Sequence, residues 1–393
     1  MEIALLIWMV LLLHINLLHG LKATLSQDEK IMVRRRLELI NKPAIKSFLT
    51  RYGDILDCVE INKQLAFDHP SLRNHSIQMK GNLKIPKQTN SIDRSLKILK
   101  PSHIVPKSMR CPRGTVPIKR IQEEDLAMEK FSSKISTSIS SKSIKTQDDL
   151  PPGHQIATLV AFANNVGASG LINVWSPEVT NEQLSDTSVF VASDDGFVSN
   201  AISAGWAVNP YLYQNLTRLF GYWTRDSGKS TGCFNTICPG FVQVSQKIAL
   251  GATIQPISTY WGAQYFISIT IQQDQNTKNW WLLYGNEQVG YWPKELFGTL
   301  SNGATRAGWG GEISSPSTEA TPGMGSSHFP EEGYSKACII CKLKLVGQEN
   351  FPNGTDLKLA QSKPDCYKAM YGGDVGGDFG HHMFVGGPPN CKF

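Results

Sequence analysis

The 393-residue chain is poor in charged residues and has no long apolar run after its first twenty residues. Charged residues make up 18% of it, below the roughly 25% that is usual in globular domains, and 41% of its residues are hydrophobic. This composition excludes a disordered chain, and the lack of a second apolar run predicts no stable membrane insertion. P-loop, dinucleotide-binding, His-Glu-x-x-His and Gly-x-Ser-x-Gly motifs are also missing, so we predict no cofactor and no metal site.

Glycine and tryptophan are scarce in the first 150 residues. Only 4 of the 34 glycines lie there, and of nine tryptophans only Trp8 does. Charge divides at the same place, because residues 1–150 carry a net +10 and residues 151–393 a net −4. The overall +6 therefore comes from one part of the chain, and no nucleic-acid partner is predicted from it. The protein therefore consists of two parts that differ in composition.

The N-terminus has the pattern of a secretory signal peptide. An uncharged apolar core from Ile3 to Leu13 is too short to span a bilayer, and polar sequence follows, so residues 1–22 are predicted to be removed. Glu2 stands where a basic residue is usual, which leaves an uncleaved anchor as the alternative. Eight cysteines suit an oxidising compartment. Three glycosylation sequons, at Asn74, Asn215 and Asn353, also favour secretion.

Residues 23–130 are predicted to form a small α+β unit. Ser26 and Glu29 make a capping box, apolar residues follow at helical spacing, and Pro43 ends the predicted helix. Cys58 and Cys111 are the only cysteines before residue 150, so we expect them to pair. Residues 131–153 are rich in Ser, Thr and Lys and end in Pro-Pro-Gly, which predicts an exposed linker open to proteases.

Residues 154–393 have β patterns throughout. Short β-rich runs cover 157–163, 170–175, 188–192 and 289–292, and residues 267–272 and 280–284 flank a turn-rich segment, which predicts a hairpin. Many short strands without helical periodicity predict a mainly β fold, an antiparallel β-sandwich or jelly roll. On architecture alone, a lectin-like jelly roll is a possible function class.

Two C-terminal segments resemble metal sites. Residues 372–382 combine glycines with Asp374, Asp378, His381 and His382, for which a glycine-rich turn is the simpler interpretation. Cys338 and Cys341 have zinc-ribbon spacing, but no second pair stands at a suitable distance. A structural disulfide, to each other or elsewhere, is the favoured interpretation of these two cysteines.

Several short segments, taken together and in this order, make the sequence resemble a known family. They are Leu39–Pro43, Asp57–Ile61, Ala66–Pro70, Cys111–Ile118, Ala204–Trp206, Ser230–Cys233, Cys238–Val242, Val289–Pro293, Trp309–Glu312, Gly323–Ser326, His328–Pro330 and Gly386–Pro388. Over nearly its whole length after the signal, the chain resembles the plant neprosin family of glutamic prolyl endopeptidases, which are made as zymogens with an N-terminal activation peptide.

The resemblance implies an extracellular protein of the apoplast or cell wall, or of the vacuole. Its expected partners are proline-containing peptides or proteins and its own N-terminal prosegment. It also implies the disulfides Cys233–Cys238 and Cys366–Cys391 beside Cys58–Cys111, with Cys338 and Cys341 left over. The resemblance implies no metal site.

The family's chemistry needs two glutamates, one to activate water and one, kept neutral, to assist the carbonyl or the leaving nitrogen. The resemblance places the second on Glu312, in Trp-Gly-Gly-Glu, and the first immediately before Ala-Gly-Trp, where this sequence has Ser203. A hydroxyl cannot replace a carboxyl in acid–base chemistry at acid pH, so the expected dyad is incomplete. Two functions follow: a peptidase whose activity is weak or lost, or a catalytically dead relative that binds peptides or cell-wall polymers.

Overall fold

The computed structural model describes residues 27–83, 96–123, 150, 153–180, 182–194, 199–209, 216–316 and 319–391. The predicted signal peptide, most of the predicted linker and Asn215 lie outside them. The chain forms two compact units, residues 1–39 and 40–393. Within the described residues no helix is both long enough and apolar enough to cross a bilayer.

The first unit contains most of the one long helix of the described residues. Helix α2 runs from Gln27 to Ile40, so it begins directly after the predicted capping serine and ends three residues before the expected stop at Pro43. A proline at that point has no amide hydrogen to continue the helix. The predicted helix is therefore present.

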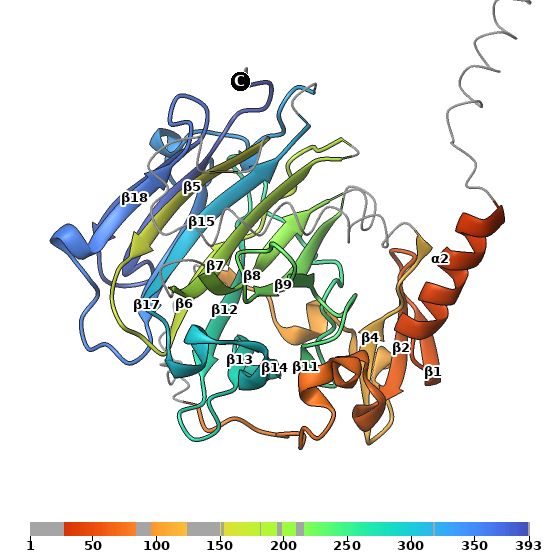
Figure 1. The fold of residues 1–393 in the computed structure, drawn as a ribbon. Coiled ribbons are helices and arrows are strands. Elements are labelled where there is room, and N and C mark those ends of the chain that lie inside the picture. Colours follow the sequence, from red (N-terminus) through yellow and green to blue (C-terminus); the bar gives the residue numbers. More distant parts are fainter. Residues whose placement is uncertain are drawn as a thin grey trace, which may run out of the picture. The chain divides into compact units, whose positions relative to one another are not determined.

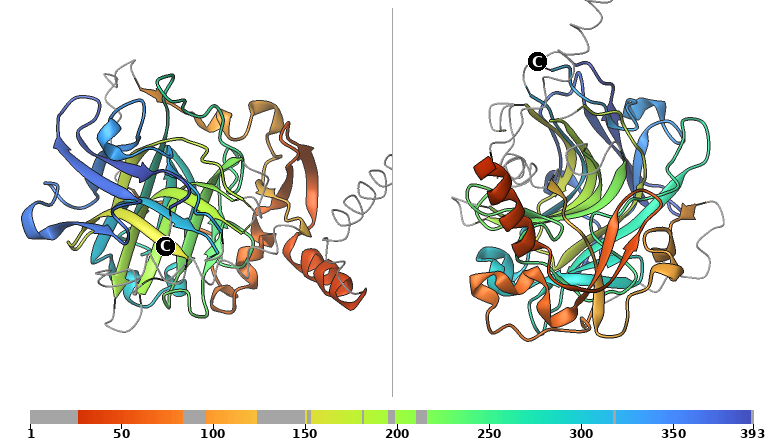
Figure 2. Two further views of the ribbon diagram at one scale, coloured as in Figure 1. Left: turned by 90° about the horizontal axis from the view of Figure 1, so that it is seen from above. Right: turned by 90° about the vertical axis from the view of Figure 1, so that its right-hand side faces the viewer.

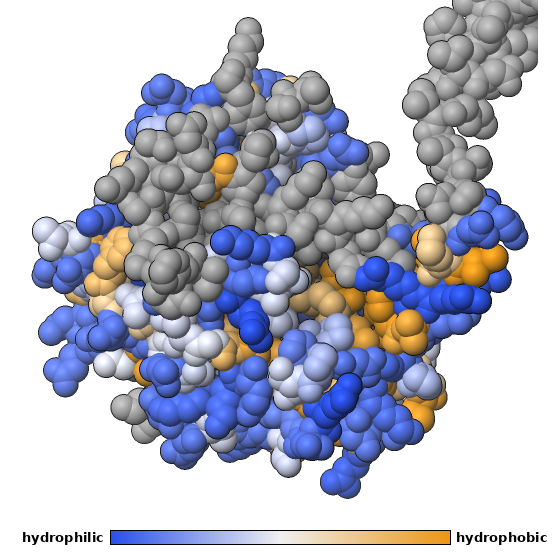
Figure 3. Space-filling view, viewed as in Figure 1, coloured by the Kyte–Doolittle hydropathy of each residue, from blue (hydrophilic) through white to orange (hydrophobic). Residues whose placement is uncertain are grey.

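The second unit begins with a small three-stranded antiparallel sheet, in the order β1-β2-β4. Its strands are β1 (Ala44–Leu49), β2 (Ile55–Glu60) and β4 (Thr115–Lys119). Strand β1 is an edge strand that exposes Ile45 and Leu49, and apolar surface is visible where this sheet lies in Figure 3. Short 3-10 helices follow β2: η1 (Ile61–Lys63), η2 (Leu65–Asp68), η3 (Pro70–Leu72), η4 (Pro101–His103) and η5 (Lys107–Met109).

A seven-stranded antiparallel sheet has the order β10-β9-β8-β7-β15-β5-β18, and its long strands lie side by side in Figure 1. The strands are β5 (His154–Ala161), β7 (Leu184–Asp194), β8 (Ser199–Val208), β9 (Thr217–Thr224), β10 (Cys233–Phe234), β15 (Arg306–Ser314) and β18 (Leu357–Gln361). Four of them, β9, β8, β7 and β15, are buried along their full length apart from Asp194.

A ten-stranded sheet packs against the first. Its central order is β11-β14-β13-β12-β6-β17-β20-β16, with β19 beside β20 and β3 beside β12. The strands are β3 (Lys97–Ile98), β6 (Gly167–Asn173), β11 (Val242–Gln243), β12 (Tyr265–Gln273), β13 (Trp280–Tyr284), β14 (Glu287–Trp292), β16 (Met324–Gly325), β17 (Cys338–Leu345), β19 (Lys368–Asp374) and β20 (His381–Gly387). Short 3-10 helices η7 (Lys294–Leu296), η8 (Thr299–Asn302), η9 (Pro330–Glu332) and η10 (Gly354–Asp356) lie in its connections.

The core lies between the two sheets. Trp206 on β8 donates its indole N–H to the carbonyl of Asn173, and Trp309 on β15 donates to that of Ser169, each at 2.9 Å. Both acceptors are on β6 of the other sheet, and both indoles are fully buried. The layered arrangement is visible from two further directions in Figure 2. Burying such large side chains in two facing layers is what stabilises a β-sandwich, and the predicted mainly β, antiparallel fold is confirmed.

The predicted hairpin is β12–β13, with Ile271 opposite Leu282. The glycine-rich segment 372–382 is also a hairpin, because β19 pairs with β20. Among the described residues no group of His, Cys, Asp or Glu could hold a metal ion. The structure contains the three expected disulfides, Cys58–Cys111, Cys233–Cys238 and Cys366–Cys391.

The expected disulfide of Cys338 or Cys341 is wrong, because both are free, buried thiols. Both lie on β17, three residues apart. Extended chain separates such residues by roughly 10 Å, whereas the Cα atoms of a disulfide are within about 7 Å. The strand itself therefore prevents a bond between them.

Candidate active site

The candidate site is the outer face of the seven-stranded sheet, defined as the face turned away from the ten-stranded sheet. Side chains alternate between the faces of a strand. Since Trp206 and Trp309 point to the core, their neighbours point outward. The outer face carries small residues at its centre, among them Ser188, Gly205 and Gly310, which share one row across β7, β8 and β15.

Ser203 lies in the next row of this face. Its strand partners are Phe190 on β7 and Tyr222 on β9, and beyond Phe190 the row continues to Gly308 on β15. Ser203 is fully buried, and its hydroxyl makes no hydrogen bond with the described residues. A Cβ on Gly308 would approach the Phe190 ring to 2.5 Å. No carboxylate therefore stands in the row of Ser203.

Glu312 lies two rows away, also on the outer face. It is opposite Asp186 on β7, whose other partner is Ala207 on β8. Four residues along a strand and two strands across correspond to roughly 16 Å at standard sheet spacings. The structure thus does not bring Ser203 and Glu312 into contact, although the expected dyad requires it.

Glu312 has a histidine partner instead. Its Oε1 lies 2.8 Å from Nδ1 of His154, the first residue of β5, and Nε2 of the same ring lies 3.1 Å from the hydroxyl of Ser314. The register explains this meeting, because Ser314 is directly opposite His154 and Glu312 precedes it by two residues. Glu312 is 4% exposed and His154 is 2% exposed. These groups form a buried polar chain along β5 and β15.

Asp186 adds a second carboxyl to this cluster. Burial raises its pKa well above the usual range, and the negative charge of Glu312 raises it further, while a hydrogen bond from Ser188 acts in the opposite direction. Two buried carboxyls at one place cannot both ionise cheaply. Asp186 therefore keeps its proton to a higher pH than an ordinary aspartate does.

No sequence motif marked His154 or Asp186 as a site residue. His154 follows the Pro-Pro-Gly of the linker, and Asp186 lies in a β-rich run without a motif. Only the register of β5, β15 and β7 places them beside Glu312. A position in the alternating pattern was the single available clue, because it assigns both to the outer face.

Residues 40–121 pack against the sandwich through buried polar contacts. The side-chain amide of Gln64 donates to the backbone carbonyl of Gln243 and accepts from its backbone N–H, each at 2.9 Å. Asp54, in the β1–β2 turn, forms a 2.7 Å ion pair with Arg218 of β9, and both are over nine-tenths buried. Arg218 stands in the same row of the outer face as Asp186 and Glu312. The N-terminal part thus reaches the face that carries the candidate site.

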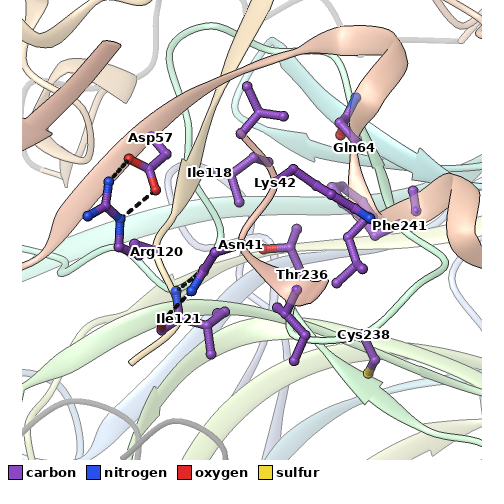
Figure 4. Close-up of a pocket in the computed structure, with 14 residues that line it drawn as sticks. Asn41, Lys42, Asp57, Gln64, Ile118, Arg120, Ile121, Thr236, Cys238 and Phe241 are labelled. Carbon is purple, nitrogen blue, oxygen red and sulfur yellow. Dashed lines mark hydrogen bonds and ion pairs between the residues drawn. The ribbon is translucent and has the colours of Figure 1, made fainter. Parts of the chain in front are cut away.

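A small pocket lies at this boundary (Figure 4). On one side, Arg120 makes a two-pronged ion pair with Asp57, and the Asn41 side chain exchanges hydrogen bonds with the backbone of Ile121. Thr236, Cys238 and Phe241 of the sandwich line the other side. Hydrogen bonds within the prosegment therefore hold its side of the pocket in place.

Two family models match the sequence. The sequence model of the neprosin domain matches residues 181–388, and that of the neprosin activation peptide matches residues 47–160. This chain belongs to the neprosin family. In this neprosin-family protein the activation-peptide match covers β2, β4 and the second half of β1 and continues into β5. The N-terminal part is therefore a prosegment, and its partner is the domain that follows.

Two solved structures are also similar. One is scytalido-glutamic peptidase with a transition-state analogue inhibitor, with 10% identity, 60% of this chain and 98% of that chain covered, and a TM-score of 0.31. The other is the same peptidase with a peptide-based transition-state analogue, with 9% identity, the same coverages and a TM-score of 0.26.

Proposed function

We propose that this neprosin-family protein is a secreted, zymogen-type relative that binds proline-containing peptides and whose two-glutamate peptidase activity is weak or lost. The observation that supports this is the row of Ser203. Ser203 is flanked by Phe190 and Tyr222 with Gly308 beyond, so this row holds no acid. Glu312 is held two rows away by His154.

Secretion is part of the proposal. The apolar N-terminus, the three disulfides and the sequons support it, and Asn74 and Asn353 are exposed as glycosylation requires. The proposed location is the apoplast or cell wall, with the vacuole as the alternative.

The test compares binding with cleavage. The full chain, nicked in the 131–153 linker, is titrated with a proline-rich peptide by calorimetry at pH 4, and the same mixture is followed by mass spectrometry. We expect binding without cleavage. Ser203→Glu should not raise cleavage, because a carboxyl at 203 would not reach Glu312. Efficient acid cleavage by the natural sequence, abolished by Glu312→Gln, would refute the proposal.

A peptidase in which Asp186 takes the place of the missing glutamate is the second candidate, and one observation favours it. Glu312 lies opposite Asp186, whose pKa is raised by burial and by the charge of Glu312, and a carboxyl that keeps its proton beside a second carboxyl suits hydrolysis at acid pH. In that case Asp186→Asn should lower acid cleavage by about 10²–10⁴-fold, the usual contribution of a general acid or base. Unchanged cleavage in Asp186→Asn would eliminate this candidate.

A further inference from the structure

An open cavity lies between the prosegment and the ten-stranded sheet. Its volume is about 380 Å³, which is within the range of ligand pockets, roughly 300–1,000 Å³. One wall consists of residues between 98 and 110, with η4 and η5, and the other consists of Lys247 and the turn between β13 and β14. Both walls belong to the compact unit of residues 40–393. Here this space is called the boundary cavity.

The boundary cavity is basic. Its charged lining residues are four cations and one acid: Lys100, Lys107, Arg110, Lys247 and Glu287. The acid is already bonded, because its carboxylate pairs with Lys247 at 2.6 Å and accepts from the hydroxyl of Ser245 at 2.7 Å. The three cations of the prosegment wall form no ion pair with any described residue. Three positive charges therefore line one cavity without a counter-charge in the described part of the chain.

The wall that carries these three cations is held at both ends. At one end β3 runs parallel to β12, and the N–H of Leu99 donates to the carbonyl of Phe266 at 2.7 Å. At the other end Arg110 precedes Cys111, which forms the disulfide with Cys58 on β2. A ligand that meets a wall already in place loses less of its binding free energy to the ordering of the protein.

Apolar residues line the same cavity. Leu99 and Val105 are buried, and Ile98 is half-buried. Apolar surface adds nothing to the binding of a bare inorganic anion, so this lining favours an organic anion. Tyr284 is the single aromatic residue of the described lining, and it is buried. Nucleic-acid bases stack on exposed aromatic rings, so the lining does not suit a single-stranded nucleic acid.

We propose that the boundary cavity binds a carboxylated sugar chain, that is, a segment of an acidic polysaccharide. Each ring of such a chain carries a carboxylate beside C–H surface, which matches several separate cations beside apolar side chains. The guanidinium of Arg110 can hold a carboxylate by two parallel hydrogen bonds, whereas the lysines act as point charges. Because both walls contribute cations, the ligand bridges the prosegment and the sandwich. This binding is separate from the proposed binding of peptides.

The experiment titrates the full chain with trigalacturonate at pH 7 by calorimetry. Maltotriose, a neutral trisaccharide, and citrate, a small tricarboxylate, are the matched ligands. We expect saturable binding of trigalacturonate, about tenfold tighter than that of citrate because apolar contacts add to charge, and no binding of maltotriose. Exposed charges are screened by salt, so the affinity should fall between 50 mM and 500 mM NaCl. Equal affinity for citrate would overturn the sugar chain as the ligand, and binding of maltotriose would overturn the role of charge.

Variants on both walls test whether the ligand bridges them. Lys107→Gln on the prosegment and Lys247→Gln on the sandwich should each lower the affinity about two- to fivefold, the effect of one exposed ion pair. Glu287→Gln removes the acid and should raise the affinity by a similar factor. If the Lys247–Glu287 pair only maintained the shape of the wall, both variants would lower the affinity. The control is Lys80→Gln, because Lys80 is an exposed prosegment lysine outside the described lining, and this variant should bind normally.

Three further results would overturn the proposal. They are no saturable binding of trigalacturonate, an equal loss of affinity in Lys80→Gln and Lys107→Gln, and tighter binding of hexaglutamate, which would indicate an acidic peptide as the ligand. Circular dichroism shows whether each variant folds, and if one does not, the comparison of ligands on the natural sequence still decides. The assay involves no cleavage and no proline-rich peptide, so its result does not depend on the proposed function.

Discussion

At the scale of single residues, the outer face combines two unusual polar groups. Ser203 is a buried hydroxyl without a hydrogen bond among the described residues. Asp186 is a buried carboxyl whose pKa is raised by burial and by Glu312. Folding gains little from either group, because each loses its water contacts on burial. Such groups mark positions that packing alone does not explain.

Ser203→Ala should therefore not destabilise the protein. The unpaired hydroxyl is removed, so we expect the free energy of unfolding to stay equal or rise by up to about 1 kcal/mol. Urea unfolding followed by circular dichroism measures this. The control is Ser245→Ala: Ser245 is also buried, but its hydroxyl donates to Glu287 at 2.7 Å, and its loss should cost about 1 kcal/mol. Equal losses in both variants would contradict the description of Ser203.

Asp186→Asn should become relatively more stable than the natural protein as pH rises. The folded pKa of Asp186 lies above its usual 3.8, so its favourable contribution is complete below that value and is lost as the pH rises toward the folded pKa. Asparagine has no such dependence. Urea unfolding at pH 3 and pH 7 should show the variant gaining over the natural sequence. An unchanged difference at the two pH values would contradict the raised pKa.

At the scale of elements, local patterns were sufficient for the helix after Ser26, the hairpin β12–β13 and the β-rich character of residues 154–393. The site was predictable only in part, because strand pairing between distant segments decides it. Sequence order separates Ser203 from Glu312, and Glu312 from His154, by more than a hundred residues each. Only the order β8-β7-β15-β5 shows that the first pair is apart and the second is in contact.

Strand β17 supplies a prediction of its own. Burial raises the pKa of the Cys338 thiol and of the Cys341 thiol to about 12 each, so neither is a reactive thiolate at pH 8. Iodoacetamide should leave both unmodified in the folded protein and alkylate both in 6 M guanidinium without reductant. Mass spectrometry counts the adducts. Failure of the unfolded protein to react would mean that these cysteines are oxidised.

At the scale of the whole molecule, charge alone suggests that a basic N-terminal part is attracted to an acidic C-terminal part. The contacts between residues 40–121 and the sandwich are made by particular polar groups. They include amide hydrogen bonds such as those between Gln64 and the backbone of Gln243, and the ion pair buried on both sides has the reverse sign, with the acid, Asp54, on the prosegment. Buried contacts are screened by salt much less than exposed charges. The association therefore depends on protonation of particular groups more than on net charge.

Two groups at this contact set the direction of its pH dependence. The His75 ring bonds the Tyr291 hydroxyl at 2.8 Å, and burial lowers its pKa despite the opposing charge of Glu295. Asp274 accepts hydrogen bonds from Gln78 and from the backbone of Asn82, and hydrogen bonds lower its pKa although burial acts in the opposite direction. For both, stabilisation is present above the ordinary pKa, 6.5 and 3.8, and disappears as pH falls.

After a cut in the 131–153 linker, the prosegment fragment should stay bound at pH 7, even in 0.5 M NaCl, and dissociate toward pH 3. No covalent link holds it, because Cys58 and Cys111 pair within the fragment. Size-exclusion chromatography of the nicked chain at each pH and salt concentration measures retention. In His75→Gln the loss of affinity between pH 7 and pH 5 should be smaller, since glutamine does not titrate. Release by salt at pH 7 would instead support attraction between the net charges, and full retention at pH 3 would exclude the roles given to His75 and Asp274.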